Sequence, residues 1–167
     1  MANLKLTHVI DCDAARFWEV FLDKEFNEAL YLKALGFPQW SIVEQKDTPT
    51  GAFRKCQGQP NMNMPGPVAK LLGSGFKYVE DGNLDRAANT WKFKMTPSTL
   101  ADKIRNEGTV RVEAAGDGKV KRIADLVIEA KIFGIGGMVE STAEKSLRDG
   151  WDKSAVFFNE WLAKHPK

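Results

Sequence analysis

Residues 138–163 carry the clearest periodicity in this chain, and the period is that of an α-helix. Apolar and small residues recur there at steps of three and four. These residues are Val139, Ala143, Leu147, Gly150, Ser154, Phe157, Phe158, Trp161 and Leu162. At ~100° per residue they fill a stripe roughly 140° wide, and about 26 residues at ~1.5 Å each give a rod of roughly 39 Å. Such a helix crosses a whole small domain, so the rest of the chain must cover its apolar stripe.

The centre of this stripe is occupied by small residues, Gly150 and Ser154, with the large Phe158 one turn further on. Glycine inside a helix costs ~1 kcal/mol relative to alanine, so some other interaction should compensate. One explanation is close approach to another backbone in a tightly packed core. The other is space beneath the helix for a ligand, in which case these three residues contact it. The sequence leaves both explanations open.

The beginning of the chain predicts one strand and two short helices. Apolar residues alternate with polar ones over residues 4–10, which is the pattern of a strand with one apolar face. Asp13 and Asp23 stand at N-cap positions before two helical stretches. Gly36 and Pro38 end the second stretch, and from there the period changes to two.

The middle of the chain predicts about six strands joined in sequential order. Residues 76–80 read as a strand that ends in a turn at Gly82 and Asn83. A half-buried strand is expected where Trp91, Phe93 and Met95 alternate with lysines, and a later hairpin strand carries Leu126 and Ile128. This series of strands, with two short helices before it and a long helix after it, predicts an α+β domain. Its antiparallel sheet is expected to be curved and exposed to solvent on one face.

Composition places the chain among ordinary globular proteins, with 43% hydrophobic and 28% charged residues. Its 167 residues predict a single domain over 1–167. A net charge of +2 argues against nucleic acid as a partner, and no apolar run is long enough for stable membrane insertion. Residues 1–5 lack the apolar core of a signal peptide. Cys12 and Cys56 are too few for a disulfide scaffold and predict reduced thiols in a cytoplasmic protein.

Signals for catalysis, metals and cofactors are absent from the sequence. There is no P-loop, no HExxH pair, no dinucleotide fingerprint and no G-x-S-x-G elbow. His8 and His165 do not stand at metal-ligand spacing with either cysteine. We therefore expect no metal, no cofactor and no assigned catalytic residue, which favours a protein that is not an enzyme.

Three polar or flexible residues remain as candidates for ligand contact. His8 interrupts an apolar strand face. It is either a buried histidine whose hydrogen-bond partner is a backbone carbonyl of the protein, a polar anchor for a ligand head group, or a general acid or base. Met62 and Met64 lie between prolines and either line the mouth of a cavity or pack over the edge of the sheet. The sequence does not choose among these interpretations.

Two segments give the chain a family resemblance: residues 8–21, a strand followed by an acidic cap and a helix with its Trp18, and residues 132–137, a glycine-rich turn into the terminal helix. Over nearly its whole length the chain resembles the START-like superfamily, also called SRPBCC or the polyketide cyclase and lipid-transport group. It looks most like a bacterial branch known only as a domain of unknown function. The resemblance implies the helix-grip fold, in which a curved antiparallel sheet of about six to seven strands wraps around a long C-terminal helix. Two short helices follow the first strand, and an apolar cavity lies between sheet and helix.

The resemblance also implies a class of function, since relatives bind lipids, sterols, polyketides or quinones and some are cyclases, dehydratases or chaperone co-activators. We expect non-enzymatic binding, with transport as an extension, of a small hydrophobic ligand such as a lipid. The expected ligand contacts are His8, Met62, Met64, Trp91, Phe93, Met95, Leu126, Ile128, Gly150, Ser154 and Phe158.

Two alternatives remain. One is an enzyme of the polyketide cyclase type that uses His8 or a buried carboxylate on an apolar or aromatic substrate. The other is a co-chaperone-like protein-interaction module whose protein partner is unknown. An apolar cavity of ~300–1,000 Å³ would favour ligand binding. Titratable groups that converge inside the cavity would favour an enzyme. A filled core with an exposed apolar patch would favour the protein-interaction module.

Overall fold

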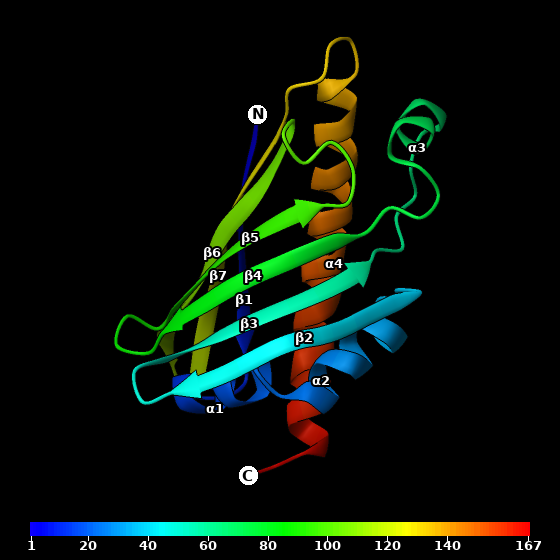
Figure 1. Ribbon diagram of the computed structural model, residues 1–167. Helices are drawn as coiled ribbons and strands as arrows, with labels where there is room; N and C mark the ends of the chain where they lie inside the picture. The colour runs from blue at the N-terminus through cyan, green and yellow to red at the C-terminus, as the bar shows by residue number, and fades with distance from the viewer.

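The computed structural model describes residues 1–167 and consists of a seven-stranded antiparallel sheet with a long C-terminal helix (Figure 1). The strands are β1 (Ala2–Ile10), β2 (Gln39–Thr48), β3 (Gly51–Gln59), β4 (Tyr78–Asp85), β5 (Thr90–Pro97), β6 (Ile104–Gly116) and β7 (Lys119–Ala130). The helices are α1 (Ala14–Phe21), α2 (Lys24–Glu28), the π-helical η1 (Ala29–Ala34), α3 (Gly66–Leu72) and α4 (Gly136–Lys164). The expected helix-grip architecture is confirmed. No helix combines the length and apolarity that a membrane span requires.

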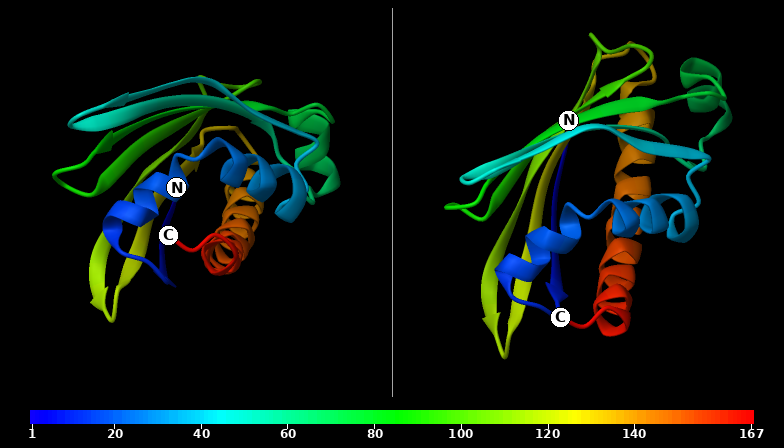
Figure 2. Two further views of the ribbon diagram at one scale, coloured as in Figure 1. Left: turned by 90° about the horizontal axis from the view of Figure 1, so that it is seen from below. Right: turned by 60° about the horizontal axis from the view of Figure 1, so that its bottom comes forward.

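The strand order is β1-β7-β6-β5-β4-β3-β2, so consecutive strands are neighbours except where the chain leaves β1. β1 pairs along its whole length with β7, from Ala2 opposite Ile128 to Ile10 opposite Val120. The chain then crosses to the opposite edge of the sheet through α1, α2 and η1. Seen from below, the sheet forms an arc with α1, α2 and α4 on its inner side, while α3 lies at one end of the arc (Figure 2).

The short helices begin where the sequence predicts them. The Asp13 carboxylate accepts a hydrogen bond from the Arg16 amide at 2.8 Å, and the Asp23 carboxylate accepts one from the Phe26 amide at 2.8 Å. After α2 the helix widens into η1, where the Leu35 amide donates to the carbonyl five residues earlier. The sequence predicted this stretch as ordinary helix, and the wider turn gives its residues a different spacing along the inner side of the sheet.

Two apolar clusters hold α4 against the sheet. In the larger one, Phe158 of α4 stacks on Phe17 of α1 with ring centroids 5.0 Å apart and lies 4.8 Å from Phe26 of α2. In the smaller one, Val68 and Leu72 of α3 pack with Ala130 of β7 and Val139 of α4. The first cluster fixes the C-terminal half of α4 and the second fixes its beginning, so the helix is anchored at both ends.

One expected turn proves to be part of a strand. Gly82 and Asn83 lie inside β4 and pair with Phe93 and Lys92 of β5. The glycine is required by packing, because a Cβ at this position would overlap the indole ring of Trp91. Trp91 is fully buried and lies across the backbone of Gly82. A glycine inside a strand often marks such a close approach, and the turn prediction was wrong because it treated Gly82 as a local signal only.

Replacing Gly82 with alanine is expected to lower the free energy of unfolding by ~1–3 kcal/mol, because the new methyl group forces Trp91 out of its position. Urea denaturation followed by circular dichroism measures this loss. Gly150→Ala is the matched control, since its Cβ meets no other atom within 4 Å, and it should gain up to ~1 kcal/mol. Equal effects of the two substitutions would contradict the packing of Trp91 on Gly82.

Candidate functional site

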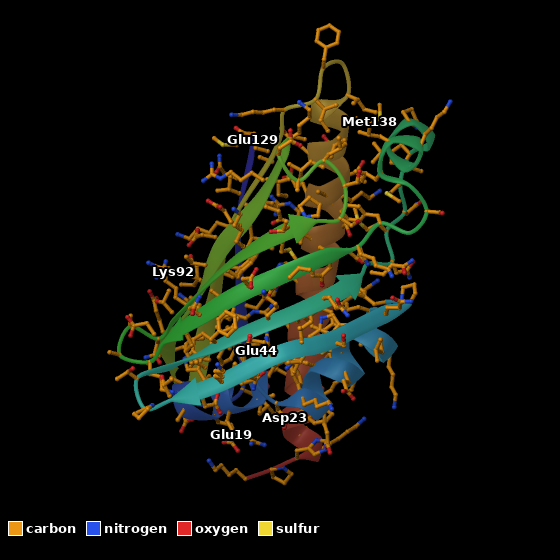
Figure 3. The ribbon with its side chains drawn as sticks, in the orientation of Figure 1. Glu19, Asp23, Glu44, Lys92, Glu129 and Met138 are labelled. Atoms are coloured by element: carbon orange, nitrogen blue, oxygen red, sulfur yellow. The ribbon has the colours of Figure 1, made fainter.

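A cavity of about 290 Å³ lies between α4 and the concave face of the sheet. Its walls are mostly apolar and touch both anchoring clusters of α4. Asn61, Asp149 and Lys153 line the cavity and are exposed at the surface, so the cavity meets solvent between the β3–α3 loop and α4. Polar residues on the outer face of the sheet lie on the other side of the sheet from this cavity. Lys92 and Glu44 stand on the face of the sheet turned away from α4 (Figure 3).

Most of the expected ligand contacts line this cavity. They are Met62, Trp91, Phe93, Met95, Leu126, Ile128, Gly150, Ser154 and Phe158. Met64 does not: it packs against the smaller cluster, which contains Val68 and Leu72. His8 does not line the cavity either and lies directly behind the wall residue Arg122.

The two small residues of α4 are small for different reasons. A Cβ on Gly150 would meet no atom of the rest of the protein within 4 Å, so close approach to another backbone does not explain this glycine. The space beside it belongs to the cavity. Ser154 is buried, and its hydroxyl donates to the Trp151 carbonyl at 2.7 Å and accepts from Arg122 at 3.0 Å. Ser154 therefore supplies a needed acceptor as well as room.

Arg122 of β7 connects the cavity wall to the surface through His8. Its Nη1 donates to Ser154, and its Nη2 donates to the Trp151 carbonyl and to His8 Nδ1, each at 3.0 Å. Arginine has no acceptor, so His8 Nδ1 accepts and His8 Nε2 carries the proton that it donates to Asp152 at 2.7 Å. His8 is half-buried, and both of its ring nitrogens have partners within the protein, Arg122 and Asp152. Burial lowers the pKa of Arg122 to about 10.

A second buried arginine, Arg54 of β3, has few partners. Its side chain is 2% exposed and donates one hydrogen bond, from Nη1 to the Phe21 carbonyl at 2.9 Å. The guanidinium lies 4.9 Å from the Phe21 ring centroid and 5.1 Å from that of Trp91. The carboxylate of Glu80 on β4 is 3.9 Å from Nη2, which is beyond hydrogen-bond range. Burial raises the pKa of Glu80, while the charge of Arg54 opposes the rise.

Tyr31 of η1 and Tyr78 of β4 complete this group, which we call the polar cluster: Arg54, Glu80, Tyr31 and Tyr78. All four residues line the cavity. Burial raises the pKa of both tyrosines, and the negative charge of Glu80 adds to the rise. The hydroxyls therefore stay protonated at neutral pH and make no hydrogen bond within the protein. The polar cluster offers a ligand several donors and one carboxyl group inside an otherwise apolar space.

Sequence reasoning missed the polar cluster and Arg122, although a signal for them was present. Charged residues stand at inward positions of three strands, between buried neighbours two residues away: Arg54 between Ala52 and Cys56, Glu80 between Tyr78 and Gly82, and Arg122 between Val120 and Ala124. The same signal drew attention to His8. A charged residue on a buried strand face is rare unless it has a partner or a function, so the alternation pattern alone could have marked these positions.

The shifted pKa of Glu80 predicts how stability depends on pH. Its pKa in the folded protein lies above the ordinary value of 4.5, so between these two values the folded protein holds a proton that the unfolded chain has released. Stability contributed by Glu80 is therefore present below pH ~4.5 and is lost as the pH rises through the folded pKa. We expect the free energy of unfolding of the wild type, minus that of Glu80→Gln, to fall as the pH rises from 4.5.

Urea denaturation of both proteins across this pH range gives the difference directly. Glu44→Gln, which alters an exposed carboxylate on the outer face of the sheet, serves as the control and should show no such fall. A difference that grows with pH would mean that Arg54 stabilises the ionised form of Glu80, against the burial effect described above.

Comparisons with known proteins establish the family. The model of a family described as "Protein of unknown function (DUF2505)" matches residues 5–162. The chain belongs to this family. A comparison with curated protein sequences finds no match at a significant level. The DUF2505 assignment confirms the expected domain of unknown function, and the START-like resemblance is confirmed for the fold.

Solved structures share the fold of this DUF2505 protein at low sequence identity. The Zhui aromatase/cyclase from Streptomyces sp. R1128 has a TM-score of 0.66 at 11% identity, over 99% of this chain and 96% of that one. Norcoclaurine synthase from Thalictrum flavum, in complex with dopamine and hydroxybenzaldehyde, has a TM-score of 0.64 at 15% identity, over 99% and 88%. A START superfamily protein from Mycobacterium smegmatis has a TM-score of 0.63 at 15% identity, over 96% and 98%. At these identities the likeness concerns the fold alone.

Proposed function

We propose that this DUF2505 protein binds one small, mainly apolar molecule in the cavity between α4 and the sheet, without transforming it. The observation that carries this proposal is the cavity itself: about 290 Å³ of space with apolar walls and a polar cluster that has few hydrogen-bond partners. Ligand pockets have this construction, with apolar walls for affinity and a few polar groups for orientation. The volume lies near the lower end of the range for such pockets, which suits a single-chain lipid or a compact aromatic molecule better than a two-chain lipid.

The walls supply the binding free energy and the polar cluster supplies orientation. A ligand that buries roughly 200 Å² of apolar surface gains about 5 kcal/mol at ~25 cal/mol per Å². Part of this gain is lost to the ordering of the ligand. Hydrogen bonds from Arg54, Tyr31 and Tyr78 then favour molecules that place an oxygen atom at the polar cluster. Phe93 and Met95 lie along β5 beside the same space, so the rest of the molecule meets apolar side chains.

A second function, proton-transfer catalysis of the cyclase type, is favoured by one observation. Glu80 is a buried carboxyl with a raised pKa in a cavity that also holds Arg54 and two tyrosines. Glu80 would remove a proton from a carbon next to a carbonyl group, and the electron pair would move onto the carbonyl oxygen, where Arg54 stabilises the enolate. The related folds of an aromatase/cyclase and of norcoclaurine synthase support this candidate. The protein-interaction alternative calls for a filled core, which a cavity of this size does not provide.

Native mass spectrometry of the gently purified protein tests the binding proposal. We expect a complex whose mass exceeds that of the chain by one small molecule, and the molecule should be released on denaturation. Extraction and analysis of the released compound then identifies it. If the protein carries no small molecule as purified, and takes up none after incubation with a panel of apolar compounds, the proposal is wrong.

The same preparations separate binding from catalysis. If the bound molecule is recovered unchanged after prolonged incubation with excess protein, the protein is a binder. Conversion that stops in Glu80→Gln, while binding persists, would establish the second function in its place.

A further inference from the structure

The buried charges of the cavity wall do not balance. Arg54 and Arg122 are 2% and 4% exposed, and the single buried carboxyl among the lining residues is that of Glu80. The remaining charged lining residues, Asp149 and Lys153, are exposed on α4 and pair with each other at 2.9 Å. Two guanidiniums thus face one carboxyl group, which is held 3.9 Å from Arg54 and whose pKa is raised by burial. The buried wall carries an excess of positive charge.

Neither guanidinium uses its full capacity for hydrogen bonds. A guanidinium has five N–H donors. Arg54 donates to one acceptor, the Phe21 carbonyl, and its Nε has none. Arg122 donates to Ser154, the Trp151 carbonyl and His8, all uncharged, and its Nε also has no acceptor. Buried cations of this kind are normally paired with an anion. The charge of Asp152 raises the pKa of Arg122, but its carboxylate is hydrogen-bonded to His8 and not to the guanidinium.

Tyr31 lies within range of both charges. Burial and the charge of Glu80 raise the pKa of the Tyr31 hydroxyl, while the charges of Arg54 and Arg122 both lower it. The charge of a deprotonated Tyr31 would in turn raise the pKa of Arg122. Both guanidiniums therefore favour a negative charge near this hydroxyl, whereas burial and the charge of Glu80 oppose it. The hydroxyl itself is an additional donor without a partner.

We infer that the natural ligand carries an anionic oxygen group, a carboxylate or its equivalent, and that this group lies between Arg54 and Arg122 next to Tyr31. The inference rests on the proposed binding function and specifies its ligand as an apolar acid. The apolar part of the acid occupies the space along β5 and α4. The anion adds negative charge beside the two guanidiniums, and charge-assisted hydrogen bonds from their terminal nitrogens would hold it. A neutral molecule of the same shape leaves Arg54 with Glu80 at 3.9 Å and Arg122 with Asp152 behind His8 as their counter-charges.

The test compares probes that share a dodecyl-length chain and carry an anionic, a neutral or a cationic head group. N-phenyl-1-naphthylamine, a neutral dye that fluoresces in apolar surroundings, is bound to the wild type and displaced with dodecanoate, methyl dodecanoate or dodecyltrimethylammonium at neutral pH. We expect dodecanoate to displace the dye at a concentration at least about tenfold lower than the ester, because charge-assisted hydrogen bonds to a buried cation are lost in the ester. The ammonium compound should be the weakest of the three. This comparison requires no substitution in the protein.

Variants locate the effect. Arg122→Gln and Arg54→Gln should each reduce the preference for acid over ester, while Arg105→Gln, which removes an exposed guanidinium on β6, should leave it unchanged. If the ester binds the wild type as tightly as the acid, the inference is overturned and the binding function stands. If an acid preference survives in both cavity variants, the anion lies elsewhere and the inference is also overturned. Failure of the dye and of every probe to bind would overturn the proposed function, and the inference with it.

Discussion

Ending the chain after Gly137 is expected to abolish cooperative folding. The deletion removes nearly all of α4, which contributes Phe158, Ala155 and Ser154 to the buried interior. The concave face of the sheet and the inner sides of α1 and α2 would then be exposed to water, and loss of apolar burial on this scale exceeds the stability of a typical domain. The deletion also removes the acceptors of Arg122 on Ser154 and Trp151 and leaves it only its hydrogen bond to His8.

Thermal and urea unfolding followed by near-ultraviolet circular dichroism measures the result. The truncated chain should show no sigmoidal transition and no near-ultraviolet signal. A chain that ends after Lys164 is the control, since it retains all of α4 and should unfold cooperatively. A cooperative transition in the chain that ends after Gly137 would show that the sheet is stable without its helix and would contradict the role assigned to α4.

Phe158→Ala is expected to lower the free energy of unfolding by ~3–5 kcal/mol. Phe158 is 2% exposed, stacks on Phe17 and contacts Phe26, so it joins α4 to both short helices. It also lines the cavity. The space left by the missing ring joins the existing cavity, so few neighbouring side chains can move in to fill it. The loss of free energy of unfolding should therefore lie in the upper part of that range.

Urea denaturation at constant pH gives the change. Phe133→Ala is the matched control, because Phe133 lies fully exposed in the loop between β7 and α4, at 104% of its reference area, and should alter stability by no more than ~0.5 kcal/mol. Similar effects of the two substitutions would mean that Phe158 does not anchor the helix.

The fold could be predicted from the sequence because its main signals are local. The helical stripe of α4 and the alternation in β1, β5 and β7 each arise within one element, and Asp13 and Asp23 cap the helices that directly follow them. The failure at Gly82 has the opposite cause. Its reason for being glycine is the ring of Trp91 on the neighbouring strand, and no window of sequence around Gly82 contains that information.

The site was predictable in its apolar part only. Its wall residues follow the alternation of apolar residues in the strands that also form the core, and this alternation can be read from the sequence. These residues are Trp91, Phe93, Leu126 and Ile128. The polar part depends on pairs of residues far apart in the chain. Arg122 meets Ser154 across 32 positions, and His8 meets Asp152 across 144. His8 could be recognised as unusual from its strand alone, but its role depended on partners in β7 and α4.

The proposed binding site is the space beneath Gly150, and the most direct measurement is dye binding by a variant in which that space is filled. Gly150→Leu adds a side chain where no atom of the rest of the protein lies within 4 Å of the new Cβ, and it removes the helix penalty of ~1 kcal/mol. Gly137→Leu introduces the same side chain at an exposed position of the same helix, also with no atom within 4 Å. Fluorescence titration with N-phenyl-1-naphthylamine compares these two variants with the wild type.

We expect the wild type and Gly137→Leu to bind one dye molecule per chain with equal affinity. Gly150→Leu should be at least as stable as the wild type in urea and bind the dye at least about tenfold more weakly, because the leucine occupies the volume that the dye needs. Equal binding by all three proteins, or no binding by the wild type, would contradict a binding site beneath Gly150.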